Sequence, residues 1–261
     1  MLGGVESFFK QGERVAIKPN LCNYKYSYPA TSSIQTMKVI IEVVRQFTDK
    51  IFVIESPSAT MSTPRKYRAL GYDQLEGVTL IDLNKNPLVK GVDFDKLINL
   101  CNLKTSEIGV ASCGMKNIFG CYPNRNKAKF HSDIENALVE INRRYSSDLV
   151  IVDAFLGMEG EGPIYGNPIL MNLLVAGDNV VAADYVGCQL MSINPICVPY
   201  LLLASVKGLG NIDEIKVLGE TIETARRKFR MASPETLKHK VKHFICSFDF
   251  AMRWLAKLKR S

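Results

Sequence analysis

Short, uninterrupted apolar runs recur along this chain, and segments with helical periodicity separate them. The runs RVAIK at residues 14–18, IFVIE at 51–55 and LVIVD at 149–153 carry apolar side chains at successive positions rather than at alternate ones. This pattern is typical of strands that are buried on both faces of a sheet. Because such strands alternate here with helices, the sequence predicts an α/β fold in which helices cover both faces of a parallel or mixed sheet.

The same periodicities give approximate bounds for each element. We expect strands at residues 14–18, 51–55, 78–83, 97–100, 108–111, 149–153 and 215–218. We expect helices at residues 31–48, 63–70, 131–145, 179–191 and 198–207. A polar, irregular connection is expected at residues 84–96.

The basic residues are concentrated at the C-terminal end. The formal net charge is +7 at pH 7, yet residues 226–261 hold eleven Lys or Arg against two acids, Glu235 and Asp249. That end therefore carries +9 and residues 1–225 carry −2. A protein that reads nucleic acid normally spreads positive charge over one face of its fold, so this distribution argues against a nucleic-acid partner. We expect one α/β domain over residues 1–225 and a basic appendage over residues 226–261.

Residues 237–260 of the appendage have the pattern of an amphipathic helix. One face would carry Val241, Phe244, Ile245, Phe248, Met252, Leu255 and Leu258. Basic side chains lie mostly elsewhere, which fits an interfacial helix in peripheral contact with a membrane. The alternative, which we favour, is a helix that docks on the body or mediates self-association.

Cysteine usage indicates a reducing environment. The chain has seven cysteines, an odd number, and none forms a C-x-x-C pair. With no signal-peptide pattern and no apolar run of roughly 18 residues, we expect a cytoplasmic protein that is at most peripheral to a membrane. Four thiols near the expected strand ends could bind an iron–sulfur cluster or zinc, namely Cys22, Cys101, Cys113 and Cys121. The alternative is that each behaves as a small buried apolar side chain.

Polar side chains follow several of the expected strands. Lys18 and Asn20 come at the end of the first strand, Lys104 follows the strand at 97–100, and Lys116 and Asn117 follow the next one. In open α/β sheets, ligands bind beyond the carboxyl ends of the strands. Lysine and asparagine donors there suit a phosphate or carboxylate group. The sequence therefore predicts a site for a small anionic metabolite, with structural ion pairs as the alternative.

A glycine-rich segment follows the strand that ends at Asp153. It reads GMEGEGP over residues 157–163, and its backbone N–H groups at Gly160 and Gly162 could cradle an anion. Neither a P-loop nor a dinucleotide-binding spacing is present. Asp153, Glu159 and His131 are the expected proton-transfer groups. The alternatives are a glycine-rich surface turn and a solvent-facing histidine.

Several motifs in fixed order are similar to a known family. They are KPN at residue 18, Lys104-Thr105, GMKNIFG from Gly114, His131, IVDAFLGMEGEGPIYGNP from Ile151, AGDNVVAAD from Ala176 and GLG from Gly208. Together they resemble the domain-of-unknown-function family numbered 362 over roughly residues 12–220. The family has no settled reaction, and some of its members are described as iron–sulfur proteins.

The resemblance implies site residues rather than a reaction. The implied positions are Lys18, Asn20, Lys104, Lys116, Asn117, His131, Asp153, Glu159, Gly160, Gly162, Pro163 and Asp184. Ser106 stands where the family often has histidine, which removes one acid–base or metal-ligating group. The four-cysteine run of a ferredoxin-like module is also missing, so the sequence assigns no cofactor.

Three hypotheses follow. The first is an anion-binding α/β protein, with enzyme activity left open. The second is an iron–sulfur or metal-binding redox protein that uses the four cysteines. The third is a non-catalytic, membrane-apposed binding protein that acts through the basic helix.

Overall fold

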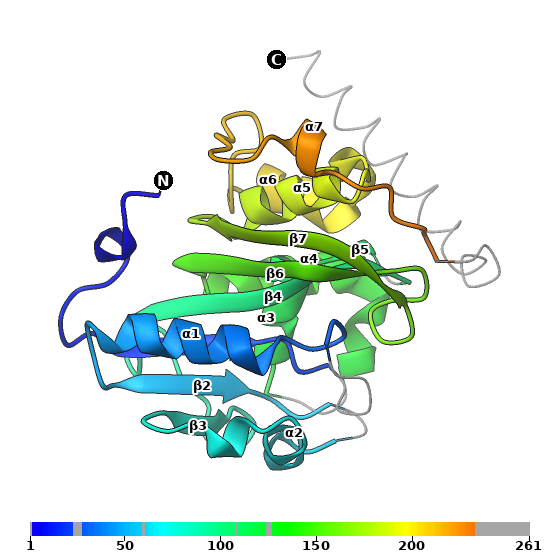
Figure 1. Cartoon of the computed structure of the whole chain (residues 1–261). Helices are drawn as coiled ribbons and strands as arrows, with labels where there is room; N and C mark the ends of the chain where they lie inside the picture. Colours follow the sequence, from blue (N-terminus) through cyan, green and yellow to red (C-terminus); the bar gives the residue numbers. More distant parts are fainter. Residues whose placement is uncertain (1, 23–27, 59–60, 108, 124–126, 233–261) are drawn as a thin grey trace.

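In the computed structural model, the described part of the chain forms one mixed sheet with helices on both of its faces (Figure 1). The structure describes residues 2–22, 28–58, 61–107, 109–123 and 127–232. Its seven strands have the order β3-β2-β1-β4-β6-β7, and β5 pairs with β4. Strands β5 and β7 run antiparallel to their partners, and the other pairs are parallel. The expected α/β class is confirmed.

The elements have the following bounds. The strands are β1 Val15–Pro19, β2 Ile51–Glu55, β3 Thr79–Asp82, β4 Lys96–Ser106, β5 Val110–Ser112, β6 Leu149–Glu159 and β7 Asn167–Gly177. The helices are α1 Ile34–Arg45, α2 Thr63–Ala69, α3 Gly114–Ile118, α4 Ile134–Arg144, α5 Val180–Leu190, α6 Pro199–Val206 and α7 Ile222–Ala225. Short 3-10 turns cover Val5–Ser7, Tyr72–Gln74, Phe119–Cys121, Lys127–Asp133 and Pro195–Cys197. No helix among these is long and apolar enough to cross a membrane.

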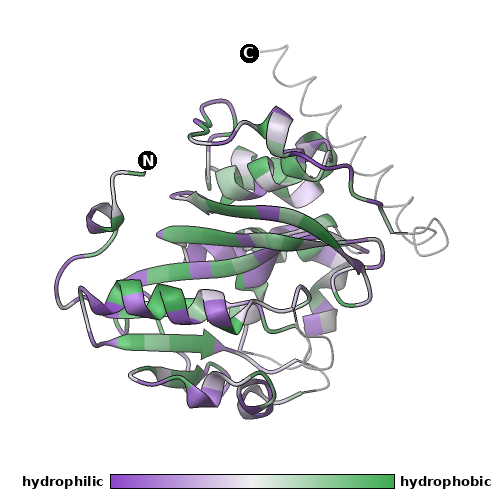
Figure 2. Cartoon of the chain, in the orientation of Figure 1, coloured by the Kyte–Doolittle hydropathy of each residue, from purple (hydrophilic) through white to green (hydrophobic). Residues whose placement is uncertain are grey.

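Alternating side chains of β1 divide the core into two layers. Val15 and Ile17 pack on the apolar stripe of α1, together with Tyr67 of α2. Ala16 points the other way and packs with Ile141 of α4. Helices α3, α5 and α6 share a third buried cluster with α4 on that second face. Figure 2 shows the apolar colouring that runs along the strands between these layers.

Several elements differ from the sequence-based expectations. Strand β6 continues to Glu159, and β7, which was not expected, pairs with it as a long hairpin. The short helix α3 follows β5 and was also not expected. Residues 215–218 do not form the expected strand and instead lie along a groove beside β7. An apolar run does not by itself specify a hydrogen-bonding partner, and these residues have none in the sheet.

The strand order creates a switch point beside β1. The chain moves outward from β1 to β2 and β3, and then returns to form β4 on the other side of β1. Helix α1, after β1, covers one face, whereas α3 and α4, after β4, cover the opposite face. Ligands of open α/β sheets bind at such a switch point, beyond the carboxyl ends of the strands. Lys18 of β1 and Lys104 of β4 lie near the carboxyl ends of these two neighbouring strands.

Candidate functional site

Three lysines surround one buried glutamate at the carboxyl ends of β1 and β2. Lys18 Nζ lies 2.9 Å from one carboxylate oxygen of Glu55, and Lys66 Nζ lies 3.7 Å from the other. Lys127 Nζ donates to Ser56 Oγ at 2.6 Å, directly beside Glu55. Lys18, Lys66 and Glu55 are each at most 3% exposed. We call Lys18, Lys66, Lys127 and Glu55 the lysine cluster.

The pKa shifts in this cluster follow from burial and from charge. Burial would raise the pKa of Glu55, but the ammonium groups of Lys18 and Lys66 prevail and hold it below its ordinary value. Burial lowers the pKa of Lys66, and Glu55 only partly opposes that effect. For Lys127, burial with the nearby Lys66 and Lys18 lowers the pKa to about 8, although Glu55 favours the charged form. One carboxylate thus faces three amino groups, and the cluster carries excess positive charge when all of them are protonated.

Asn117 connects this cluster to the neighbouring strands. Its Nδ2 donates to the Lys18 carbonyl at 3.0 Å and to Asn99 Oδ1 on β4 at 2.8 Å. Its Oδ1 accepts from Lys18 Nζ at 3.5 Å. The side chain is therefore used to hold α3 against β1 and β4, which positions the amide at the switch point.

Lys104 and Asn20 meet on the other side of the switch point. Lys104 Nζ donates to the Ala30 carbonyl at 2.9 Å and lies 3.8 Å from Cys22 Sγ. Asn20 Nδ2 donates to Asn102 Oδ1 at 3.1 Å. Asn20 directly follows β1, whereas Asn102 and Lys104 lie within β4, which continues to Ser106 instead of ending at residue 100 as expected.

Lys116 and Asp153 each have side-chain hydroxyl groups among their hydrogen-bond partners. Lys116 Nζ donates to Ser106 Oγ at 2.7 Å, at the position where the resemblance leads us to expect histidine. Asp153, 2% exposed, accepts from Tyr28 Oη at 2.7 Å and from Thr36 Oγ1 of α1 at 2.9 Å. Burial and the neighbouring Asp153 raise the pKa of Tyr28, so its hydroxyl remains a donor. Asp153 therefore has polar donors rather than a lysine as its immediate partners.

The glycine segment does not aim its two expected amides at a ligand. The N–H of Gly160 donates to the Arg230 carbonyl at 2.7 Å, and that of Gly162 donates to the Gly160 carbonyl at 2.8 Å. Glu159 accepts from the Arg230 N–H at 2.8 Å. Gly160 and Glu159 thus hold Arg230 at the end of β6. This arrangement differs from the expected anion cradle and from the expected proton-transfer role of Glu159.

Asp184 has a structural role rather than the ligand-binding role that the resemblance implied. It is fully buried in α5, and its carboxylate accepts from the N–H groups of Gly114 at 2.6 Å and Met115 at 3.1 Å. These are the first N–H groups of α3, which otherwise lack partners. Burial raises the pKa of Asp184 to about 7, although both backbone donors oppose the shift. Asp184 thereby fixes the helix that carries Lys116 and Asn117.

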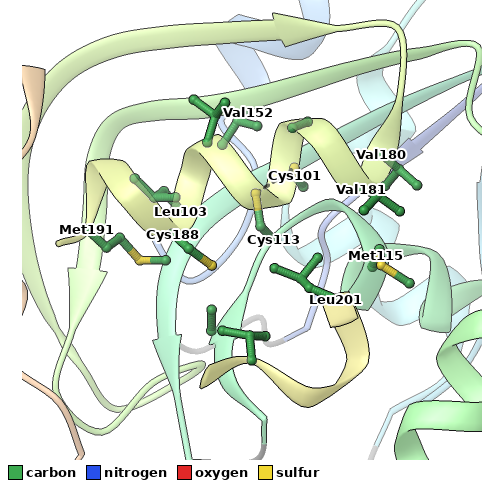
Figure 3. Packing of buried hydrophobic residues seen from close by; sticks show 14 of the residues in the cluster. Cys101, Leu103, Cys113, Met115, Val152, Val180, Val181, Cys188, Met191 and Leu201 are labelled. Carbon is green, nitrogen blue, oxygen red and sulfur yellow. Dashed lines mark hydrogen bonds between the residues drawn. The ribbon is translucent and has the colours of Figure 1, made fainter. Parts of the chain in front are cut away.

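The four cysteines do not converge. Cys101 and Cys113 lie together, with their sulfurs 3.6 Å apart, in the apolar cluster drawn in Figure 3. Cys121 belongs to a different buried cluster, and Cys22 Sγ donates to the Ala30 carbonyl. Within the described ranges, no group of three or more His, Cys, Asp and Glu side chains is placed to hold a metal. Cys101, Cys113 and Cys121 are buried among apolar side chains, which fits the alternative that each behaves as a small apolar residue.

The side chain of one expected residue is not described, and the sequence analysis did not select two lysines of the lysine cluster. His131 is in the turn Lys127–Asp133, but its side chain is not described. The structural ion pair that we gave as the alternative for the lysines is present between Lys18 and Glu55. Sequence reasoning did not select Lys66 or Lys127. A signal for Lys66 exists, because it shares the buried stripe of α2 with Thr63 and Tyr67. Lys127 follows no strand and gives no comparable signal.

Comparison with known proteins places the chain among its relatives. A thylakoid-associated protein of Synechocystis sp., sll1697, is 28% identical over 233 residues, which cover 80% of this chain and 72% of that protein. No solved structure matches significantly. The family described as "Domain of unknown function (DUF362)" matches residues 15–189, the span that contains β1, β4, α3 and the residues of the switch point. The chain therefore belongs to the DUF362 family.

Proposed function

We propose that this protein binds a small anionic ligand, one that carries a phosphate or carboxylate group, at the lysine cluster. The observation that carries the proposal is the imbalance of charge around Glu55, where three lysine amino groups share one carboxylate. Removing an ammonium group from water costs several kcal/mol unless an opposite charge compensates for it. An incoming anion supplies that charge.

The surroundings of the cluster support the same proposal. Two more lysines, Lys104 and Lys116, come from β4 and α3, which border the same switch point. Lysine ammonium groups act as point charges and bind phosphate and carboxylate groups without a fixed approach angle. Asn117 supports this site by holding Lys18 in place, because the carbonyl of Lys18 accepts from Asn117 Nδ2 at 3.0 Å.

Enzyme activity would place proton transfer on Lys127. A lysine whose pKa lies at about 8 exists partly as a neutral amine near neutral pH, and such groups serve as general bases. The reaction itself is not assigned.

Thermal unfolding with inorganic phosphate, pyrophosphate and small dicarboxylates tests the binding proposal. We expect at least one of these anions to raise the melting temperature of the natural protein. The substitutions Lys104→Met, Lys116→Met and Lys127→Met should reduce that increase and keep the circular dichroism spectrum unchanged. Lys90→Met is the matched control, because Lys90 pairs with Asp148 at the surface. No increase with any anion, or an equal increase in all variants, would contradict the proposal.

A second candidate function is binding at a membrane surface through the C-terminal segment. Near the end of the described chain, exposed basic side chains lie next to the exposed Met231, and the basic 237–260 segment follows them; they are Arg226, Arg227, Lys228 and Arg230. One relative is described as thylakoid-associated. Basic side chains near an anionic bilayer contribute about 1 kcal/mol each.

Flotation with vesicles that contain anionic lipid tests this second function. If the C-terminal segment binds the bilayer, the full chain should float, whereas a chain that ends at Ala232 should float much less. Neutral vesicles are the control. Equal flotation of the two chains would reject the proposal.

A further inference from the structure

An apolar groove runs beside β7, at the edge of the sheet. Its volume is about 600 Å³, and it lies between the end of β7, α5 and the segment 211–225. Leu173, Leu174, Val186, Ile215 and Leu218 are among its lining residues. The groove is well separated along the sheet from the lysine cluster, because β4 and β6 lie between β1 and β7.

Strand β7 itself is exposed in an unusual way. It is eleven residues long, it contains no charged side chain, and within the described ranges it pairs only with β6. Leu170 and Leu174 are 61% and 64% exposed. In Figure 1 no described helix lies in front of β6 and β7. Long, uncharged, apolar edge strands invite pairing and aggregation, so proteins normally cover them.

We propose that residues 237–260 of the same chain dock along β7, with their apolar face in this groove. The path of the chain supports this occupant. The described chain ends at Ala232, just after Arg230, whose carbonyl accepts from Gly160 and whose N–H donates to Glu159. Glu159 pairs with Asn167, the first residue of β7. The remaining 29 residues thus start beside the strand that they would cover.

The lengths agree. A helix of 24 residues, the span from 237 to 260, is about 36 Å long at about 1.5 Å per residue. A strand of eleven residues is also about 36 Å long at about 3.3 Å per residue. The groove is too small to enclose a helix, but it can receive apolar side chains from one helix face.

The charges are complementary. Asp178, Glu214 and Glu220 lie on the groove against one basic residue, Lys216, so its formal charge is −2. Residues 233–261 hold seven Lys or Arg and two acids, a net charge of +5. A helix that buries the apolar face and leaves its basic side chains at the rim would place these opposite charges next to each other. A second copy of β7 would bring no positive charge to the groove. An anionic membrane surface would be repelled by the acidic side chains at its rim.

Hydrogen exchange of the protein free in solution tests the docking. We compare the full chain with a chain that ends at Ala232, and we follow the amides of residues 167–177 and 211–218. The shorter chain should exchange at least tenfold faster in both segments, while α1 and β1 remain unchanged. Because no vesicle and no anion is present, this result is independent of both proposed functions.

Full-length variants test the charges and the apolar contact separately. The triple substitution Asp178→Lys, Glu214→Lys and Glu220→Lys should reproduce the faster exchange at 167–177, as should Phe244→Glu with Phe248→Glu. The matched control reverses three exposed acids elsewhere in the chain, Asp49, Asp73 and Glu76, and should leave the exchange unchanged. Equal exchange in the full and shortened chains would overturn the docking. So would protection that rises with protein concentration, which would indicate a second copy as the occupant.

Discussion

At the scale of single residues, the dominant feature is the unequal number of cations and anions around Glu55. Lys18 and Lys66 both depend on this one carboxylate for compensation. A buried ion that loses its partner costs about 3–5 kcal/mol, which is much more than a surface pair contributes. The site is thus sensitive to every change that alters its balance of charge.

Glu55→Gln should therefore destabilise the fold by about 3–5 kcal/mol, because it leaves three amino groups without a carboxylate. Phosphate should restore part of this loss. Urea unfolding with and without phosphate measures both effects. Glu140→Gln is the control, because Glu140 pairs with Arg143 at the surface and should cost less than about 1 kcal/mol. A small loss in Glu55→Gln with no phosphate effect would contradict the charge argument.

The amine of Lys127 should titrate near pH 8, because burial and two neighbouring lysines disfavour its charged form. Unfolding returns the pKa to about 10.4, so the unfolded chain binds more protons between pH 8 and 10. The contribution of Lys127 to stability should accordingly rise with pH over that window. NMR titration of the lysine ε-carbon signals, assigned with Lys127→Met, gives the midpoint. Bound phosphate should raise that midpoint, and a midpoint near the ordinary lysine value of about 10.4 would refute the expectation.

At the scale of elements, the short helix α3 depends on a residue from α5. Asp184 accepts the first two N–H groups of α3, and α3 carries Lys116 and Asn117. A five-residue helix has little stability of its own, since most helical stability comes from tertiary contacts. The position of the site therefore depends on a carboxylate that the ligand need not touch.

Replacing Asp184 should change how stability depends on pH. Burial raises the pKa of Asp184 to about 7, well above the value of about 3.9 in an unfolded chain. Its contribution to stability is complete below about pH 4 and is lost as pH rises to 7, because the folded form holds the proton. Relative to Asp184→Asn, the natural protein should thus lose about 2–4 kcal/mol between pH 4 and 7. Parallel urea titrations would show this, and equal pH profiles would contradict it.

Gly162 should tolerate no side chain. A Cβ there would lie 2.1 Å from the carbonyl oxygen of Thr105, so the end of β4 and the glycine segment would have to separate. Gly162→Ala should cost more than about 2 kcal/mol, as overpacked sites do. Gly208→Ala is the control, because Gly208 has positive φ but open space, and it should cost about 1 kcal/mol. Thermal melts of the two variants compare the effects, and equal losses would show that the contact is not limiting.

The sequence predicted the elements whose pattern is local. The continuous apolar runs of β1, β2 and β6, and the helix α1 within residues 31–48, fall where expected. Strand β7 was missed because its pairing depends on the hairpin with β6 and not on its own periodicity. The positions of Lys18 and Lys104 toward the carboxyl ends of β1 and β4 were predictable from the order of residues along the chain. The contacts of Lys66 and Lys127 depend on how α2 and a 3-10 turn pack over β2, which no local pattern encodes.

At the scale of the whole molecule, the charged lysine cluster and the apolar groove lie apart on the sheet. The lysine cluster lies at the β1–β2 side, and the groove lies at the β7 edge. The body carries little net charge, and the C-terminal end carries the excess. Anion binding and the C-terminal segment should therefore be separable.

Removal of residues 233–261 should leave the affinity for phosphate within about twofold, since charges beyond about 8–10 Å are screened at physiological salt. Isothermal titration calorimetry of the full and shortened chains measures this. The same deletion should lower the net charge from +7 to +2, which a shift in cation-exchange elution confirms. A loss of phosphate affinity larger than tenfold would place the C-terminal segment at the site.

The buried lysines make the surrounding electrolyte a reactant in folding. On the proposal that the lysine cluster binds an anion, the chain would take up an anion as it folds, so that the folding equilibrium would depend on anion activity as it does on temperature. At saturation, this linkage approaches one anion per folded molecule, and stability grows with the logarithm of anion concentration. The protein isolated from a cell should accordingly retain a stoichiometric counter-ion, and the mass of that ion would identify the ligand class directly.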